Sequence, residues 1–353
     1  MLNYTHGKPQ VMKSAPEVFC SPDFYPLRMD FDNGALSFVP MTRAAYKSSS
    51  FLDGRIQAAG PERYDIPAAD VLHVAAEASP PPNRVHYIFH AAFCCSTLLA
   101  RYLELIPPCF VLKEPLLLTQ MAVVRPRPFG PNDGAIEPAE WTRLFDLCVR
   151  LLGRGYAAED IVAIKVNDIC NSLGEMLLAR DPASKAVFVT IGLKDFLLVL
   201  LKSPDRRQWL RGRLLKARKD AVIVPELAEF DPVRMSDAEG GAYLWALNEA
   251  LRVRLCGLGQ SRVLTLPGEQ ISETPERAVR TVANHFGIPV SQGLPKNIFS
   301  DATAARHAKD PARTYDARSR RKELKTLQKQ IGPEADRGAE WAAKHGVLFG
   351  GRP

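Results

Sequence analysis

Between residues 84 and 287, short continuous apolar runs alternate with longer stretches in which apolar residues recur at helical spacing. Short, continuous apolar runs predict buried strands at RVHYIF (84–89), CFVLK (109–113), IVAIKV (161–166), KAVFVTIG (185–192) and SRVLTL (261–266). Apolar residues recur at helical spacing in STLLARYLELI (96–106), EWTRLFDLCVRLLG (140–153), KDFLLVLLK (194–202), RRQWLRGRLLKARK (206–219), GGAYLWALNEALRVRLCGL (240–258) and TPERAVRTVANHFG (274–287). Strands that alternate with helices predict a three-layer α/β/α fold with a mainly parallel central sheet.

The flanking segments have a different pattern. Residues 1–80 are rich in turn formers, contain the strand-like run ALSFVPM (35–41), and lead into the proline-rich break SPPPN (79–83). We expect 1–80 to be an N-terminal extension, with room for a hairpin, packed on an α/β core at 81–290. Residues 291–353 are polar and basic, and we expect two helices there, 317–331 and 336–346, packed on the core.

Composition and charge indicate what kind of ligand and setting to expect for this protein. The chain has 353 residues, is 46% hydrophobic and 24% charged, and carries a formal charge of +7, which suits a pocket for a polyanionic small molecule. The basic run SRRKELK lacks aromatic platforms and contains Glu323, so we expect no nucleic-acid partner. Seven cysteines at irregular spacings, with no signal core and no run long enough to span a bilayer, indicate a reducing, cytoplasmic setting.

The first core strand leads into HAAFCCSTLLAR (90–101), a turn followed by a helix. The amides and partial positive charge at a helix start attract phosphate, and the hydroxyls of Ser96 and Thr97 add donors. The alternative is that both residues only cap the helix. The nucleoside-triphosphatase pattern would require glycine at His90 and Cys95 and lysine at Ser96, so the usual mode of ATP binding is poorly supported.

A family resemblance covers most of residues 84–290. The stretch HAAFCCSTLLARYLELIPPCFVLKEPLLL (90–118) resembles the phosphosulfate loop, first helix and second strand of the sulfotransferases, above all a bacterial branch. IVAIKVND, KAVFVTIGLKDFLLVLLKSPDRRQWLRGR and SRVLTLPGEQISETPERAVRTVANHFGIP are similar to later parts of that family, in the same order. The resemblance implies a P-loop-like sulfotransferase fold, the donor PAPS (3′-phosphoadenosine 5′-phosphosulfate), no metal, and donor contacts from Phe93, Cys94, Cys95, Ser96 and Thr97.

Three positions depart from the family pattern. Phe93 stands where the family has a loop cation that contacts the oxygen between sulfate and nucleotide. Ile191 and Val199 stand where the family has an arginine and a serine at the 3′-phosphate. These departures imply either that other residues have taken over the contacts, or that the chain has lost the activity.

Three residues at predicted strand ends are candidates for catalysis. The resemblance implies that Glu114 is the general base; Pro115 favours an extended backbone there, and the alternative is a solvated carboxylate paired with Lys113. Lys165 interrupts an apolar strand, so it is our first candidate for the missing cation, the alternative being a lysine that reaches solvent. His90 either contacts the sulfate or is structural, and Asn167 and Asp168 also follow a strand.

Several basic or hydroxyl side chains could contact the nucleotide. Lys194, Ser203, Arg206 and Arg207 are candidates for the 3′-phosphate, although a solvated basic helix face is the simpler interpretation of the two arginines. Arg101 either touches phosphate or pairs with Glu104. The C-terminal segment offers Lys309, Arg318 and Arg321.

The function we expect is sulfuryl transfer from PAPS to a hydroxyl or amine of an unidentified small-molecule, glycan or lipid acceptor. The first alternative is a P-loop phosphotransferase or ATPase. The second is a binding protein that kept the fold and lost the chemistry. The oligomeric state is not determined by any pattern in the sequence.

Overall fold

The computed structural model describes residues 13–79, 81–126, 136–290, 294, 298–299, 306–307, 310–314 and 317–346. A five-stranded sheet forms its centre, made of β4 (Arg84–His90), β5 (Cys109–Lys113), β6 (Ile161–Lys165), β7 (Ala186–Thr190) and β8 (Val263–Pro267). The strand order is β5-β6-β4-β7-β8 and every pair is parallel. All five strands fall on the predicted apolar runs, and the predicted fold class is confirmed.

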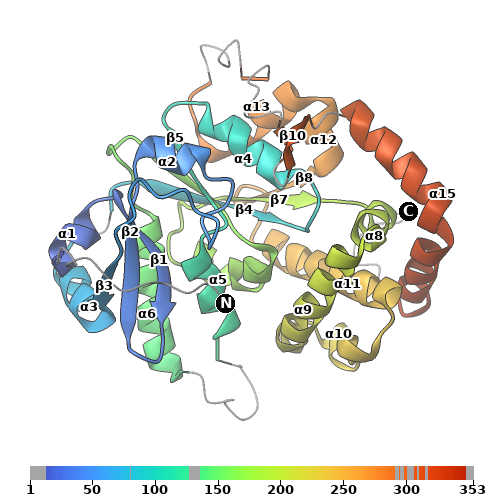
Figure 1. The fold of residues 1–353 in the computed structure, drawn as a ribbon, viewed down its shortest axis with the longest axis horizontal. Helices are drawn as coiled ribbons and strands as arrows, with labels where there is room; N and C mark the ends of the chain where they lie inside the picture. The colour runs from blue at the N-terminus through green and yellow to red at the C-terminus, as the bar shows by residue number, and fades with distance from the viewer. Residues whose placement is uncertain are drawn as a thin grey trace.

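Helices cover both faces of this sheet (Figure 1). They are α4 (Ser96–Glu104), α5 (Leu116–Val123), α6 (Pro138–Leu152), α7 (Gly174–Ala179), α8 (Leu193–Leu201), α9 (Pro204–Asp220), α10 (Pro225–Ala228), α11 (Asp237–Cys256), α12 (Gly268–Glu273) and α13 (Pro275–Phe286). Three short 3₁₀ turns complete the core: η1 (Asp168–Leu173), η2 (Ala221–Ile223) and η3 (Pro232–Arg234).

Alternate residues of each strand belong to two different cores. Ile88, Val111 and Ala163 share one core with residues of α4, α8, α11 and α13. Phe89 and Phe110, from the opposite face, share the other core with α5 and α6. A strand covered on both faces is apolar at successive positions, which explains the continuous runs in the sequence.

The N-terminal residues form a small antiparallel sheet beside the second core. Its strands are β1 (Phe24–Asp30), β2 (Ala35–Pro40) and β3 (Tyr64–Pro67), in the order β1-β2-β3, with helices α1 (Ala15–Cys20), α2 (Arg43–Ser48) and α3 (Ala68–Glu77). β1 and β2 form a hairpin, and β2 is the predicted strand-like run. Phe38 and Tyr25 are buried in the same core as α5 and α6, so this extension packs on the sheet. The division of the chain at residues 80 and 290 stays a prediction.

The C-terminal segment contains one long helix where two were expected. After the short strands β9 (Arg306–His307) and β10 (Asp310–Thr314), α15 runs unbroken from Ala317 to Lys344 with Pro333 inside it. α15 packs against α8 and α11, and its small residues Ala335, Gly338 and Ala342 are buried. Figure 1 shows this helix along the outer edge of the molecule, beside α8. A Cβ at Gly338 would lie 2.6 Å from the carbonyl oxygen of Ala238, which shows how closely α15 packs on α11. This packing keeps the helix continuous through Pro333, a residue type that usually ends a helix.

Candidate functional site

A cavity of about 300 Å³ lies at the carboxyl edge of the central sheet. Its walls come from the turn after β4, from the ends of β5 and β6, from the residues that follow α2, and from the helices α8, α9 and α15. The lining residues include Phe51, Arg55, His90, Phe93, Cys94, Cys95, Ser96, Thr97, Arg101, Glu114, Lys165, Asn167, Asp168, Val199, Lys202, Arg206, Trp209, Arg320 and Glu323. Ligands of open parallel α/β sheets bind at this edge, so this cavity is the candidate site.

The turn after β4, residues 91–95, has a backbone that glycine would ordinarily occupy. Phe93 has φ 67° and Cys95 has φ 70°. Cys95 is the N-cap of α4, and Ser96 and Thr97 are its first two residues, so neither of them is the cap. Among the described residues, the third non-glycine position with positive φ is Glu114, at 54°. All three line the cavity, and backbone strain of this kind is concentrated at functional sites.

The turn is held from two sides. On one side, a Cβ at Gly268 would lie 2.2 Å from the carbonyl oxygen of Cys94, so the start of α12 sits directly against the turn. On the other side, the ring of Phe93 packs against Trp209, with ring centroids 5.4 Å apart. The guanidinium of Arg206 lies over the same ring, 4.4 Å from its centroid. The Phe93 ring is therefore fixed between Trp209 and a cation from α9.

Glu114 and Lys165 form an ion pair inside the cavity wall. Only 1% of the Lys165 side chain and 13% of the Glu114 side chain are exposed. The Asn167 Nδ2 donates to the other Glu114 oxygen at 2.9 Å. Burial alone would raise the pKa of Glu114, but the charges of Lys165 and His90 and the hydrogen bonds from Lys165 and Asn167 together outweigh it, and the pKa falls to about 2. Glu114 is therefore a buried, ionised carboxylate.

Two expectations about Glu114 are wrong. Lys113 pairs with Glu104, with Nζ 2.8 Å from Oε1, so it is not the partner of a solvated Glu114. The Glu114 backbone is left-handed rather than extended, although Pro115 follows it. The reason is local bonding: the Glu114 amide donates to the Lys165 carbonyl at 2.6 Å, while its side chain reaches Lys165 and Asn167.

His90 ends β4 and separates the turn from the Glu114–Lys165 pair. Its Nδ1 lies 3.0 Å from the Ala91 carbonyl oxygen and its Nε2 lies 3.0 Å from that of Val166. Burial, with Lys165 adding to it, lowers the pKa of His90 to about 4. A neutral imidazole has one N–H, so it donates to one of these two carbonyl oxygens, and that bond positions the strand end, as in the structural alternative for this residue.

Arg320, on α15, is a cavity residue that the sequence analysis missed. Its side chain is buried, and its Nη1 lies 3.4 Å from the Phe93 carbonyl oxygen and 2.8 Å from the Cys95 Sγ. The sequence analysis selected its neighbours Arg318 and Arg321 instead. A run of basic residues gives no indication of which one faces inward, and only a helix phase fixed by packing on α8 and α11 decides it.

The remaining predicted contacts divide into two groups. Arg101 and Arg206 line the cavity; Arg101 donates to Ser50 Oγ at 3.0 Å, and Arg206 to the Val199 carbonyl at 2.7 Å. Lys202 lines it too, although the sequence analysis did not select that residue. Lys194 and Ser203 are not among the lining residues. Lys194 pairs with Asp336 of α15 at 3.0 Å, because α8 turns its first residues toward that helix.

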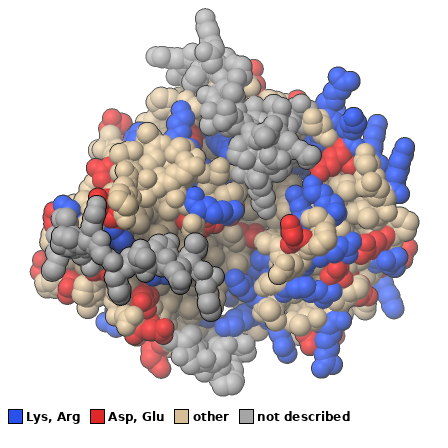
Figure 2. Space-filling model, in the orientation of Figure 1, with Lys and Arg blue, Asp and Glu red and all other residues tan. Residues whose placement is uncertain are grey.

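Other nucleotide candidates also lie elsewhere. Arg207 is bonded to Glu334 and Asp237, and Arg321 to Glu273, so both hold helices together. Arg318 belongs to an exposed basic face of α15 with Lys322, Lys325 and Lys329; Figure 2 shows Lys and Arg side chains projecting along the edge where α15 lies in Figure 1. Lys309 falls outside the described residues. Ile191 is buried, and its carbonyl accepts from the Trp245 indole.

The cavity is electropositive. Six of its lining side chains are lysine or arginine and three are carboxylates. One of the carboxylates, Asp168, is bonded to Arg213 from behind the wall at 2.9 Å. A cleft with an excess of fixed cations attracts anionic ligands.

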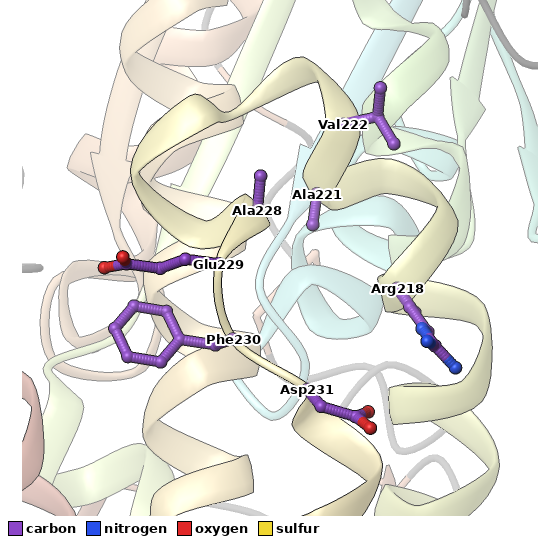
Figure 3. Close-up of a pocket in the computed structure, with 7 residues that line it drawn as sticks. All are labelled: Arg218, Ala221, Val222, Ala228, Glu229, Phe230 and Asp231. Atoms are coloured by element: carbon purple, nitrogen blue, oxygen red, sulfur yellow. The ribbon is translucent and has the colours of Figure 1, made fainter. Parts of the chain in front are cut away.

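A second cavity is larger but has a different character (Figure 3). Its volume is about 540 Å³, and it is lined by Arg218 of α9 and by Ala221, Val222, Ala228, Glu229, Phe230 and Asp231 of the segment that joins α9 to η3. Figure 3 shows Arg218 on one side of this segment and Glu229 and Phe230 on the other. The lining of this larger cavity includes no strand end and no buried ion pair, so we assign the site to the smaller cavity.

The described residues contain no group of three or more His, Cys, Asp or Glu side chains arranged to hold a metal ion. None of the helices in the described ranges combines the length and the apolar character that a membrane span requires.

Comparisons with known proteins give structural similarity only. No protein-family model matches the chain, and no curated protein matches it. The solved sulfotransferase from Alicyclobacillus acidocaldarius is similar at 17% identity and a TM-score of 0.36, over 76% of this chain and 96% of that one. The sulfotransferase domain from the curacin biosynthetic pathway is similar at 13% identity and a TM-score of 0.39, over 72% and 99%. The sulfotransferase STF1 from Mycobacterium tuberculosis H37Rv is similar at 11% identity and a TM-score of 0.36, over 73% and 82%.

Proposed function

We propose that this chain transfers a sulfuryl group from PAPS to a hydroxyl or amine of an acceptor. The observation that carries the proposal is that two features lie in one cavity. The strained turn before α4 and the Glu114–Lys165 pair line the same electropositive cavity at the carboxyl edge of the sheet. Sulfuryl transfer requires groups that bind the anionic donor and, beside them, a base for the proton of the acceptor, a role that a carboxylate can fill.

The donor would lie with its phosphosulfate at the turn. The amides at the start of α4 and the hydroxyls of Ser96 and Thr97 are the groups that would bind its oxygens. Arg101, Lys202 and Arg206 line the rest of the cavity and are candidates for the second phosphate. They replace Lys194 and Ser203 in that role.

Glu114 would accept the proton of the acceptor. In that step the acceptor oxygen or nitrogen bonds to sulfur, the bond between sulfur and the nucleotide phosphate breaks, and the proton goes to Glu114. A carboxylate with a pKa of about 2 is ionised at neutral pH but is a weak base. Movement of the Lys165 ammonium toward the leaving phosphate would stabilise that phosphate and strengthen the base at the same time.

Ligand-induced stabilisation tests donor binding. The melting temperature of the purified protein is measured with PAP, the desulfated donor, and separately with ATP and magnesium. A ligand at 100 times its dissociation constant stabilises by about 2.7 kcal/mol. Stabilisation by PAP alone supports the proposal. Stabilisation by ATP and magnesium alone supports the phosphotransferase alternative, and no response to either contradicts donor binding.

Loss of transfer with retained binding tests the role of Glu114. Glu114→Gln should bind PAP and fail to transfer sulfate from labelled PAPS to any acceptor that the wild-type protein uses. Glu104→Gln is the matched control, because Glu104 also pairs with a buried lysine but does not line the cavity. An active Glu114→Gln protein would remove Glu114 from the role of base. A wild-type protein that binds PAP but transfers to none of a broad acceptor panel supports the binding-protein alternative.

A further inference from the structure

Arg320 brings a guanidinium from the C-terminal helix onto the turn after β4. Its side chain is 7% exposed, and its Nη1 lies 2.8 Å from the Cys95 Sγ and 3.4 Å from the Phe93 carbonyl oxygen. These are the two turn residues with left-handed backbones. An arginine this deeply buried, with its head group at the lining of a cavity, is a feature that requires an explanation.

The turn itself contains no cation. Residues 91–97 are Ala, Ala, Phe, Cys, Cys, Ser and Thr, so their anion affinity depends on backbone amides, two hydroxyls and the start of α4. Such a cradle ordinarily works with a lysine or arginine that reaches the outer oxygens of the bound group. The Phe93 ring is packed on Trp209, and Lys165 is paired with Glu114.

We infer that Arg320 supplies the cation of this cradle and binds the terminal anionic group of the ligand. The contact with Cys95 suits this role, because a thiol sulfur is a weak acceptor that a phosphate or sulfate oxygen can replace. The identity of the anion as phosphosulfate rests on the proposed function, whereas the existence of an Arg320-dependent anion site does not.

The test compares two neighbouring arginines of one helix. Arg320→Met removes the guanidinium at the turn, and Arg321→Met is the matched control, because Arg321 is exposed and pairs with Glu273. Dissociation constants are measured by calorimetry for inorganic pyrophosphate, PAP and adenosine 3′-phosphate. Circular dichroism and melting without ligand establish that each variant is folded. If Arg320→Met does not fold, Arg320→Gln, which can still donate to the Phe93 carbonyl, replaces it under the same criteria.

We expect the dissociation constants for pyrophosphate and PAP to rise about 10- to 100-fold in Arg320→Met, as for one charged hydrogen-bonded contact. They should stay within about 2-fold of wild type in Arg321→Met. Binding of adenosine 3′-phosphate, which lacks the 5′ group, should not depend on Arg320. An Arg320-dependent loss for pyrophosphate together with no specific binding of PAP would support the anion site and contradict the proposed function.

Three results would overturn the assignment. The first is a wild-type protein that does not bind pyrophosphate. The second is equal affinity of wild type and Arg320→Met for pyrophosphate. The third is an equal loss of affinity for adenosine 3′-phosphate and for PAP, which would place Arg320 at the 3′-phosphate instead of the turn.

Discussion

Lys113 of β5 lies directly opposite Lys165 of β6 in the parallel register, and each of these buried lysines has a carboxylate of its own. Lys113 pairs with Glu104 of α4, and Lys165 pairs with Glu114. Register partners on neighbouring parallel strands point to the same face of a sheet, so the two lysine side chains leave the sheet on one side. Only the second pair lines the cavity, which makes the first a natural internal control.

A double-mutant cycle should separate stability from binding. Glu114→Gln or Lys165→Met alone leaves a buried charge without its partner, and each should lower the free energy of unfolding by about 3–5 kcal/mol. The double variant should lose clearly less than the sum, since the two residues are coupled. Urea unfolding measures all four proteins, and additive losses would show that the ion pair does not form.

The equivalent cycle at Lys113 and Glu104 should give similar losses in the free energy of unfolding but should leave the affinity for PAP almost unchanged. PAP affinity should change in the Lys165→Met protein, since Lys165 lines the cavity, and should stay within about 2-fold of wild type in Lys113→Met. Calorimetric titration compares them. Equal loss of affinity in both lysine variants would mean that the effect travels through the fold rather than through direct contact.

Acid should destabilise the protein in two stages. Burial lowers the pKa of both His86 and His90 to about 4, so the unfolded chain binds more protons than the folded one between pH 6.5 and 4. Stability is therefore fully present above pH 6.5 and falls on acidification, by on the order of 2–3 kcal/mol for each histidine. Glu114, whose pKa is about 2, adds a further loss between pH 4.5 and 2.

Urea unfolding at pH 7.5, 5.5 and 4.5 checks the first stage. His86→Gln keeps an acceptor for the Lys185 amide, which donates to His86 Nδ1 at 3.1 Å, and should flatten the profile between pH 6.5 and 4. His73→Gln, an exposed substitution on α3, is the control. A His86→Gln profile as steep as that of wild type would contradict the burial argument.

The left-handed backbone at Cys95 should discriminate sharply between substitutions. Cys95→Gly permits φ 70° without strain and should be neutral or stabilise by up to about 1 kcal/mol. Cys95→Val places a β-branched side chain at the same φ and should destabilise by about 2 kcal/mol. Both variants lose the sulfur contact with Arg320, so their difference in unfolding free energy isolates the backbone. Equal stabilities would mean that the turn relaxes out of the left-handed region.

Gly268 should tolerate no side chain. The Cβ of Gly268→Ala would lie 2.2 Å from the Cys94 carbonyl oxygen and 2.9 Å from that of Thr190, so the variant should lose about 2–3 kcal/mol. Gly212→Ala, on an exposed part of α9 with open space around the new Cβ, should gain about 0.5–1 kcal/mol. Thermal melting of the two variants measures these opposite shifts; a harmless Gly268→Ala would show that the turn can move away from α12.

Hydrophobic period alone was enough to place the central sheet and the edge where the site lies. Glu114, Lys165 and His90 each stand at the end of an apolar run, and parallel strands bring their carboxyl ends together, so their proximity followed from topology. The backbone conformation of the turn could not be predicted from the sequence, because the turn contains no glycine, the residue that most readily adopts a left-handed conformation. The close approach of Gly268 to the turn and the packing of the Phe93 ring on Trp209 explain that conformation.

Helix phase was the other property that the sequence left open. Lys194 opens an apolar helix and Arg320 lies in a basic, amphipathic one, and either side chain could face the cavity. Contacts between α8 and α15 decide the matter: they direct Lys194 to Asp336 and Arg320 to the turn. The same contacts carry α15 across Pro333, where local propensity predicts an interruption.

Because Arg320 lies more than 200 residues after the turn that it touches, the two halves of the cradle leave the ribosome at very different times. The sheet, the turn and the Glu114–Lys165 pair can all assemble from residues that precede α15. Until that last helix docks, a nascent or C-terminally truncated chain would have the cavity floor without its guanidinium, so competence to hold an anion would be acquired only at the end of synthesis.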